Sequence, residues 1–343
     1  MKQTNHGFYE VKPAKKGRKL LGEILGFMLG SFAVAFFCGV LYHPINDTIL
    51  ASKFEPTEDV VEIIDRLELT DRGLRIFKAS HPVLQNREEF ISSGCNDVHE
   101  TTSTLGCYDS TNIYIYNSEN AELAGLEEST AAHELLHAIW SRLAIYDTAR
   151  LMPLLDEVYD AHKDKLADYM AGYPDDQRYT ELHSVVGTEF PANELPDELR
   201  QHYEAFFADF DNIYSYYAKY NDVLARINKE IDKLSKDIER RKTEINEREE
   251  YYSREADRLS ADISDFNTRA DTEGAFASEW AFNRERNQLI TRQKELNAYY
   301  DETSHLVKEV NQKIDEYNAT AIHHNDLIQS IDSKPQNSSQ LED

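Results

Sequence analysis

The sequence predicts a mostly helical α+β protein with an N-terminal transmembrane helix, a mixed domain and a long antiparallel coiled-coil hairpin at its C-terminal end. Three patterns in the 343 residues predict this order: an apolar run over residues 20–43, short helical and strand-like segments over residues 44–211, and heptad-spaced apolar residues over residues 212–332. A basic stub, residues 1–19, precedes the apolar run. The polar residues 333–343 are expected to form a disordered tail, because they cannot contribute to a core.

The apolar run from Leu20 to His43 is predicted to cross a membrane. Its only charged residue is Glu23, and about 20 apolar residues at about 1.5 Å per residue span a hydrocarbon core of about 30 Å. A cleaved signal peptide is the alternative, but the run is long for one and no small-x-small cleavage site follows it. Six basic residues precede the run against one acidic residue. The positive-inside rule therefore places residues 1–19 in the cytoplasm, residues 20–43 in the lipid bilayer of the cell membrane, and the bulk of the chain outside.

The charge of the chain excludes one class of partner. The sequence has 63 acidic and 37 basic residues, for a net charge of −26. Nucleic acids bind to basic surfaces, whose lysine and arginine side chains neutralise phosphates. We therefore expect no nucleic-acid partner.

Two of the three cysteines are predicted to form a disulfide. Cys38 lies inside the apolar run, where it can act as a small apolar residue. Cys95 and Cys107 close a short polar loop on the external side of the predicted span. An oxidising compartment favours a disulfide between such a pair. A two-cysteine metal site and two unrelated thiols are the alternatives.

Residues 44–211 combine strand and helix signals. The best strand pattern is Asn112–Asn117, which is β-branched and aromatic and is bounded by turn residues. A turn is expected at Gly172–Asp176. Helices are predicted where apolar residues recur at helical spacing. These predicted helices are Thr57–Leu69, Leu126–Ile145, Leu154–Met170, Tyr179–Val186 and Pro196–Phe210.

Residues 212–332 are predicted to form two helical arms. One seam of apolar residues follows Leu224–Phe266 at coiled-coil spacing, and a second follows Leu296–Ile331. Between them lies Asn267–Ala277, which holds the glycine of this region. An antiparallel hairpin is therefore favoured over the alternative, one uninterrupted rod that dimerises in parallel. The arms carry no catalytic pattern and offer a surface for a protein partner.

The chemistry of the chain is expected in the motif His133-Glu134-Leu135-Leu136-His137. Residues four apart on a helix lie one above the other, so His133 and His137 can present two imidazoles to one metal ion. Glu134 points about 100° away, where it can hold a water molecule and take its proton. This residue set is typical of a Zn²⁺ site.

The order of a strand followed by the motif helix resembles the zincin metallopeptidases. The resemblance covers roughly residues 110–190, and its specific part is the five-residue motif. It implies a strand that flanks the cleft, on which an extended substrate backbone can pair, and a third metal ligand further along the chain. The chain lacks the His-x-x-Gly-x-x-His continuation of the metzincins, because Arg142, Leu143 and Ala144 follow Ser141. A glutamate from a later helix is then expected, as in the glutamate-ligand (gluzincin-like) zincins.

Two glutamates compete for the role of the third zinc ligand. Glu181 begins a helical turn with Ser184 below it, and a small residue there lets the helix pack close to the motif helix. Glu189 follows Gly187 near the end of the same predicted helix. Glu181 is preferred and Glu189 is the alternative. His183 is assigned a catalytic role, a hydrogen bond to the polarised carbonyl oxygen of the substrate.

These observations lead to one main hypothesis and one alternative. The main hypothesis is a membrane-anchored zinc metallopeptidase, which hydrolyses peptide bonds of a protein or peptide substrate outside the membrane and recruits partners or substrate through its coiled-coil arm. The alternative is a membrane-tethered coiled-coil adhesion or scaffold protein with a vestigial or structural zinc site.

Overall fold

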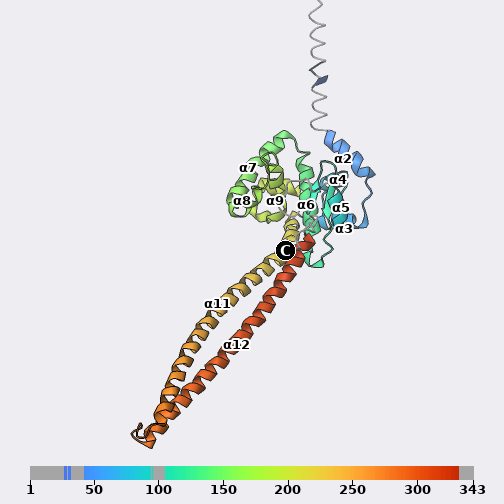
Figure 1. Cartoon of the computed structure of the whole chain (residues 1–343). Helices are drawn as coiled ribbons and strands as arrows, with labels where there is room; N and C mark the ends of the chain where they lie inside the picture. Colours follow the sequence, from blue (N-terminus) through green and yellow to red (C-terminus); the bar gives the residue numbers. More distant parts are fainter. Residues whose placement is uncertain (1–26, 29, 32–41, 94, 96–104, 332–343) are drawn as a thin grey trace, which may run out of the picture. The chain divides into compact units, whose positions relative to one another are not determined.

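The computed structural model describes residues 27–28, 30–31, 42–93, 95 and 105–331 of the chain. Within them the fold is mostly helical α+β, as predicted, with a small three-stranded sheet among helices and two long packed helices near the C-terminal end (Figure 1). The predicted stub 1–19, most of the predicted span 20–43 and the predicted tail 333–343 lie outside the described residues. No helix in the described part of the chain has both the length and the apolar character needed to cross a membrane.

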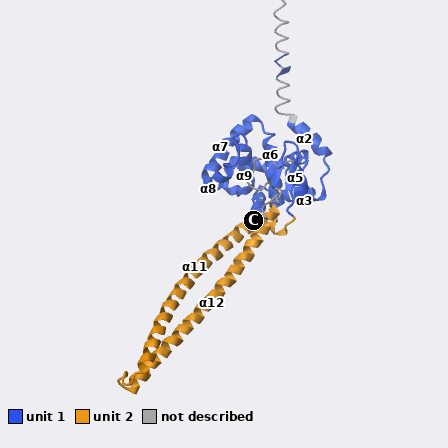
Figure 2. Ribbon diagram, in the orientation of Figure 1, with its two compact units in different colours: residues 1–118, 125–218, 333–343 blue, residues 119–124, 219–332 orange. Residues whose placement is uncertain are grey.

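The described chain divides into two compact units (Figure 2). The first, called the mixed domain below, comprises the described residues of 1–118 and 125–218 and contains the sheet. The second, called the hairpin unit, comprises residues 119–124 and 219–331. The motif predicted to bind metal lies in the mixed domain, and the predicted coiled coil lies almost wholly in the hairpin unit.

Helices make up most of the mixed domain. In chain order they are α2 (Tyr42–Lys53), α3 (Glu58–Leu67), α4 (Asp71–Ala79), α5 (Arg87–Ser92), α6 (Leu126–Trp140), α7 (Ile145–Ala161), α8 (Lys163–Met170), α9 (Arg178–Glu189), the 3₁₀ turn η4 (Ala192–Glu194) and α10 (Asp197–Glu204). The predicted helix Thr57–Leu69 corresponds to α3. The Thr57 side chain caps its first turn by accepting a hydrogen bond from the backbone of Val60, and Val60, Ile63 and Leu67 are buried.

Three short strands form the sheet in the order β1–β3–β2. They are β1 (Val83–Gln85), β2 (Gly106–Tyr108) and β3 (Ile113–Tyr116). The predicted strand Asn112–Asn117 is confirmed as β3, but it is the central strand, parallel to β1 and antiparallel to β2. Both edges of β3 are paired with other strands. The edge strand that lies beside α6 is therefore β2. Its three residues are too few to give a strand signal in the sequence.

The predicted disulfide between Cys95 and Cys107 is present, with 5.9 Å between the two Cα atoms. Both cysteines are buried with Phe90 and Tyr116 in a small cluster beside the sheet. Cys107 lies in β2 and Cys95 follows α5, so the bond ties the edge strand to that helix. The alternatives of a two-cysteine metal site and of two unrelated thiols are therefore wrong.

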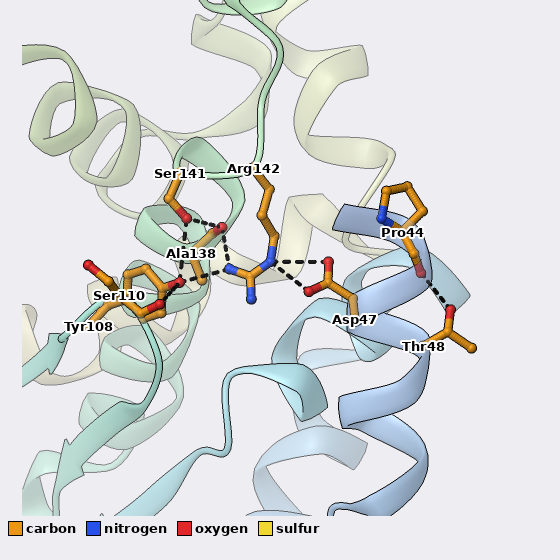
Figure 3. Close-up of polar contacts among 8 residues, drawn as sticks. All are labelled: Pro44, Asp47, Thr48, Tyr108, Ser110, Ala138, Ser141 and Arg142. Carbon is orange, nitrogen blue, oxygen red and sulfur yellow. Dashed lines mark hydrogen bonds and ion pairs between the residues drawn. The ribbon is translucent and has the colours of Figure 1, made fainter. Parts of the chain in front are cut away.

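The predicted helix Leu126–Ile145 ends early, because α6 stops at Trp140 and a short turn follows. The turn places Arg142 where its Nε donates to both carboxylate oxygens of Asp47 at 3.1 Å and its Nη1 donates to the carbonyl of Ala138 at 2.8 Å (Figure 3). The Asp47 side chain is buried, so this ion pair ties α2 to the end of α6. Neither glycine nor proline marks the turn, and the sequence therefore holds no local signal for it.

The segment Leu154–Met170, predicted as one helix, forms parts of two helices in the structure. α7 begins earlier than predicted, at Ile145, and α8 follows it after a single residue, His162. The backbone of His162 has φ −122° and ψ 34°, which lies outside the helical region and bends the chain. No breaker residue stands at this position, so the apolar pattern alone predicted one helix.

The predicted helix Pro196–Phe210 is also interrupted. After α10 the backbone leaves the helix and pairs with the loop between α3 and α4. The amide of Thr70 donates to the carbonyl of Phe206 at 2.9 Å, and the amide of Ala208 donates to the carbonyl of Glu68 at 2.7 Å. These bonds join segments about 135 residues apart, and local periodicity cannot report such a pairing.

The hairpin unit contains η3 (Ala121–Leu123), most of α11 (Phe210–Ala270) and α12 (Glu279–Ile331). Ion pairs cross between the two long helices with numbers that rise on one and fall on the other: Arg241 with Glu309, Arg248 with Glu302, and Asp262 with Arg292. The helices are therefore antiparallel, and Ile238, Ile245 and Val310 form an apolar cluster between them. This confirms the predicted hairpin over the uninterrupted rod.

Candidate metal centre

Helix α6 carries the predicted motif through the core of the mixed domain. Its apolar residues Leu135, Leu136 and Ile139 are fully buried, and they hold the helix rigidly against its neighbours. His133 and His137 lie on another face, and each keeps 17% of its side chain exposed. The helix thus presents two imidazoles at a surface that solvent can reach, while its apolar residues are packed in the core.

Helix α9 packs closely on α6 because its facing residues are small. A Cβ atom added to Gly187 would lie 2.5 Å from Cδ1 of Leu136 and 2.7 Å from Cε1 of Tyr203, so only glycine fits there. Ser184, one turn earlier, is fully buried. This close approach brings Glu181, in the first turn of α9, against the two motif histidines.

The three side chains meet at short distances. Nε2 of His133 lies 3.1 Å from Nε2 of His137. The Glu181 carboxylate places Oε1 3.4 Å from Nε2 of His133 and Oε2 3.3 Å from Nε2 of His137. Burial alone would raise the pKa of Glu181, but the two histidines outweigh this and hold the pKa well below its ordinary value. The carboxylate is therefore charged and faces two imidazole nitrogens.

Glu134 completes the group from the side of the sheet. Among the described residues, His133, Glu134 and His137 form a group that could hold a metal ion, with one ligand atom from each lying within 4.8 Å of the others. The Glu134 side chain is only 3% exposed and lies against β2. A Cβ atom on Gly106 would come within 3.0 Å of Glu134 Oε1, so the glycine at the start of β2 makes room for this carboxylate.

Hydrogen bonds from neighbouring helices orient two members of the group. Nδ1 of His137 lies 3.0 Å from Oγ1 of Thr180, and the Tyr169 hydroxyl donates to Oε1 of Glu181 at 2.6 Å. Tyr173 in turn donates to the Tyr169 hydroxyl at 3.1 Å. Burial and the adjacent Glu181 carboxylate raise the pKa of Tyr169, so it remains a donor. The sequence holds no signal for Tyr169 and Tyr173, because they lie outside α6 and α9 and have no fixed spacing to the motif.

The structure does not bring Glu189 into the group. Its Oε2 lies 3.6 Å from Nζ of Lys165, and the same lysine donates to the Glu189 carbonyl at 3.0 Å. Burial raises the pKa of Glu189, and the nearby lysine opposes that rise. Glu189 ends α9, two turns beyond Glu181. Its ion pair is with Lys165 of α8, and it acts on His133 only through space.

His183 lies in the core behind the motif helix. Its side chain is 0% exposed, and its Nε2 lies 2.9 Å from Nε2 of His202. Its ring packs against Trp140 and Tyr203, and the Tyr203 hydroxyl donates to the His183 carbonyl at 2.8 Å. Burial, followed by His202, lowers its pKa well below the ordinary value. A fully enclosed ring paired with a second histidine has no path to a substrate carbonyl, so the predicted catalytic role has no support in its surroundings.

The histidine pair predicts acid sensitivity of the fold. Burial, aided by Arg72 and Arg150, lowers the pKa of His202 to about 4, against an ordinary value of 6.5. Because the folded pKa is the lower one, the stabilising contribution of neutral His202 is complete above pH 6.5 and is lost as the pH falls toward 4. At about 1.4 kcal/mol per pKa unit, the loss should approach about 3 kcal/mol.

Denaturant unfolding of the full chain between pH 7 and pH 4 measures this loss. In His202→Gln the free energy of unfolding should depend less steeply on pH, by up to about one proton. The buried His183 and His137, whose pKa values are also lowered, should contribute to the dependence that remains. His305→Gln, at an exposed position of α12, is the control and should leave the slope unchanged. Equal slopes for His202→Gln and the wild type would contradict the assignment.

Comparisons with known proteins add no relative to this picture. Neither family models, nor curated proteins, nor solved structures match the chain. The function is therefore inferred from the site itself. Helix α6 presents His133, Glu134 and His137 as a group able to hold a metal ion.

Proposed function

We propose that the chain is a membrane-anchored zinc metallopeptidase that hydrolyses peptide bonds outside the membrane. One observation carries this proposal: the spacing of Nε2 of His133, Nε2 of His137 and the Glu181 carboxylate. Zinc–ligand distances of about 2.0–2.1 Å give about 3.3–3.4 Å between neighbouring ligand atoms of a tetrahedron. The separations of 3.1, 3.3 and 3.4 Å match one face of such a tetrahedron.

The chemistry of the donor set also fits zinc. Burial lowers the pKa of His137, although Glu181 opposes this, and a neutral imidazole is the form that binds metal. Because Nδ1 of His137 faces Thr180, Nε2 is left for the metal. Two imidazoles and one carboxylate leave a fourth position open, which is the arrangement of catalytic rather than structural zinc sites.

Glu134 is the residue proposed to handle protons. Zinc held by this set supplies Lewis acidity, which polarises a carbonyl and makes a water molecule acidic near neutral pH. The Glu134 carboxylate lies beside the histidine pair and can accept a proton from the attacking water. It can then deliver that proton to the departing amine, so that one carboxylate serves both proton transfers.

The edge strand β2 supports a peptide as the substrate. Among the described residues no strand pairs with the outer edge of β2, and its first residue, Gly106, lies against Glu134. An extended peptide can add to such an edge through main-chain hydrogen bonds. A peptide bound there would lie beside the proposed proton acceptor. Anchorage to the cell membrane, with the N-terminus in the cytoplasm, is proposed from the apolar run over residues 20–43.

A scaffold or adhesion protein with a structural zinc site is the second candidate. The observation that favours it is the long hairpin, which leaves Trp280 68% exposed near its turn and stacks Arg284 on that ring at 4.8 Å. Exposed tryptophan and arginine side chains are common anchors of protein interfaces. In the main proposal the same surface serves to recruit a partner or substrate.

Zinc content and hydrolysis of the full chain, purified in a neutral detergent, separate the two candidates. The proposal expects about one zinc per chain and cleavage of an unfolded protein or of a quenched fluorescent peptide library. A chelator should abolish cleavage, and added zinc should restore it. Bound zinc without cleavage of any peptide would favour the scaffold, and a chain that retains no zinc would overturn the site.

Tyr169→Phe tests how Glu181 is held. The substitution removes the hydroxyl that donates to Glu181 Oε1 at 2.6 Å and keeps the aromatic ring. Loss of such a supporting hydrogen bond should weaken zinc affinity by about 10–100-fold. A competition titration with a fluorescent zinc chelator measures it. Tyr179→Phe is the matched control, because it removes a hydroxyl on α9, the helix of Glu181, that donates to Asp156 of α7 instead. Equal zinc affinities of the two variants would contradict an orienting role for Tyr169.

A further inference from the structure

A small cavity with basic walls lies at the start of the mixed domain. It has a volume of about 150 Å³ and lies between the N-terminal end of α2, helix α4 and the turn from α6 to α7. Three arginines line it, Arg72, Arg75 and Arg142, together with His43. Such a group is unusual in a chain with a net charge of −26.

The acidic residues at this cavity are already engaged. Asp47 forms its ion pair with Arg142, as Figure 3 shows, and Asp147 lies 3.8 Å from Arg150. Among the described residues no carboxylate forms an ion pair with Arg72 or Arg75. Arg72 packs its guanidinium over the Phe206 ring at 4.5 Å. Asp147 attracts Arg72 through space without forming an ion pair with it. The lining therefore holds three arginines against two aspartates, an excess of positive charge that suits an anion such as a phosphate group.

Exposed apolar side chains lie on α2 and α7, two helices that contribute to the walls of the cavity. Ile145 is 89% exposed and Tyr146 is 70% exposed at the start of α7, where Tyr146 also lines the cavity. Ile45 and Ile49 on α2 are nearly half exposed, at 46% and 48%. Tyrosine and aliphatic side chains beside basic groups are typical of surfaces that lie at the interface of a membrane.

The position of the cavity in the chain points to the same partner. His43 and Pro44 line the cavity, and the apolar run predicted to cross the membrane ends at His43. If that run spans the bilayer, the beginning of α2 must lie at the membrane surface, because no linker separates the two. Lipid phosphate groups lie at that depth, within reach of the cavity.

We infer that this cavity binds the phosphate group of an anionic membrane lipid, with Arg72 and Arg75 as its ligands and with Ile145 and Tyr146 in the interfacial layer. The inference rests on the membrane anchorage in the proposed function. It commits to a lipid, because a soluble anion would gain nothing from Tyr146 beside the arginines or from the exposed isoleucines on α2 and α7.

Calorimetric titration of the full chain in neutral detergent micelles tests the inference with three probes. They are dihexanoyl phosphatidylglycerol, dihexanoyl phosphatidylcholine and inorganic phosphate. The anionic lipid should bind saturably at one per chain and roughly tenfold or more tighter than either of the other two. Equal binding of the two lipids, binding of phosphate as tight as that of the anionic lipid, or no saturable binding would overturn the inference.

Matched variants locate the site. Arg75→Glu should weaken binding of the anionic lipid by roughly tenfold or more, whereas Arg200→Glu, the same charge change on α10 beside Asp197 and Glu204, should leave it within about twofold. Tyr146→Ser, at an exposed position, should weaken lipid binding and leave phosphate binding as it is. Equal effects of Arg75→Glu and Arg200→Glu would overturn the assignment. Zinc content of the same samples reports on the proposed metal centre separately, because the cavity shares no residue with it.

Discussion

Glu134→Gln should abolish peptide hydrolysis while the full chain keeps its zinc. The amide preserves the shape of a side chain that is 3% exposed and packed against Gly106, so the fold and the histidine pair should remain in place. The amide cannot accept a proton from the attacking water, and loss of a general base costs about 10²–10⁴-fold in rate. Measured kcat/KM on a quenched fluorescent peptide, together with zinc content, checks both halves of the expectation.

Glu127→Gln provides the matched control for this substitution. Glu127 lies in the first turn of the same helix, away from the histidine pair. Its substitution by glutamine is the same chemical change at another position of α6. It should leave kcat/KM within about twofold of the wild type. Wild-type hydrolysis by Glu134→Gln would remove Glu134 from the mechanism, and loss of zinc from that variant would show that its carboxylate is a ligand instead.

His133→Ala and His137→Ala should each remove zinc from the chain, and Glu181→Ala should weaken zinc affinity by two to three orders of magnitude. The basis is the spacing of 3.1–3.4 Å among the three ligand atoms. Even structural zinc sites with four protein ligands bind with only about 10–16 kcal/mol, so the loss of one of three ligands leaves too few to hold the ion tightly. Zinc stoichiometry after dialysis and competition with a fluorescent chelator measure the two effects.

Glu189→Ala separates the two glutamates that the sequence offers. Glu189 lies on the same helix as Glu181 but pairs with Lys165, so its removal should leave zinc affinity within about twofold of the wild type. Circular dichroism of each variant verifies that the fold persists. If Glu189→Ala loses zinc and Glu181→Ala retains it, the proposed ligand set is wrong and the two residues exchange roles.

Local patterns predicted the parts of the site that lie on one helix. His133 and His137 could be paired from the sequence because the helical repeat alone places residues four apart on one face. Glu181 could be preferred because Ser184 signals a close helix contact, and in the structure its carboxylate lies against both histidines. Within the hairpin unit, the heptad seams predicted two packed helices for the same reason, since each seam is a periodic feature of one segment.

Tertiary contacts set what the sequence could not predict. Tyr169 reaches Glu181 from α8, and Gly106 faces Glu134 from a strand of three residues, so neither has a fixed spacing to the motif. The sequence suggested His183 as a hydrogen-bond donor to a substrate carbonyl, but its side chain is fully buried and its Nε2 faces His202. The helix ends after Trp140 and before Phe206 depend on Asp47 and Thr70, partners about 95 and 135 residues away.

The disulfide between Cys95 and Cys107 has a consequence for when such a peptidase could act. Cys107 follows Gly106, the residue that makes room for Glu134, so the bond anchors the strand beside the proposed proton acceptor. In the reducing cytoplasm, where the chain is synthesised, that anchor cannot persist. If the chain crosses the membrane as proposed, its edge strand β2 would be held by β3 but not by the disulfide until it reaches the oxidising side. Its assembly would itself restrain proteolysis within the compartment of synthesis, without a separate inhibitor.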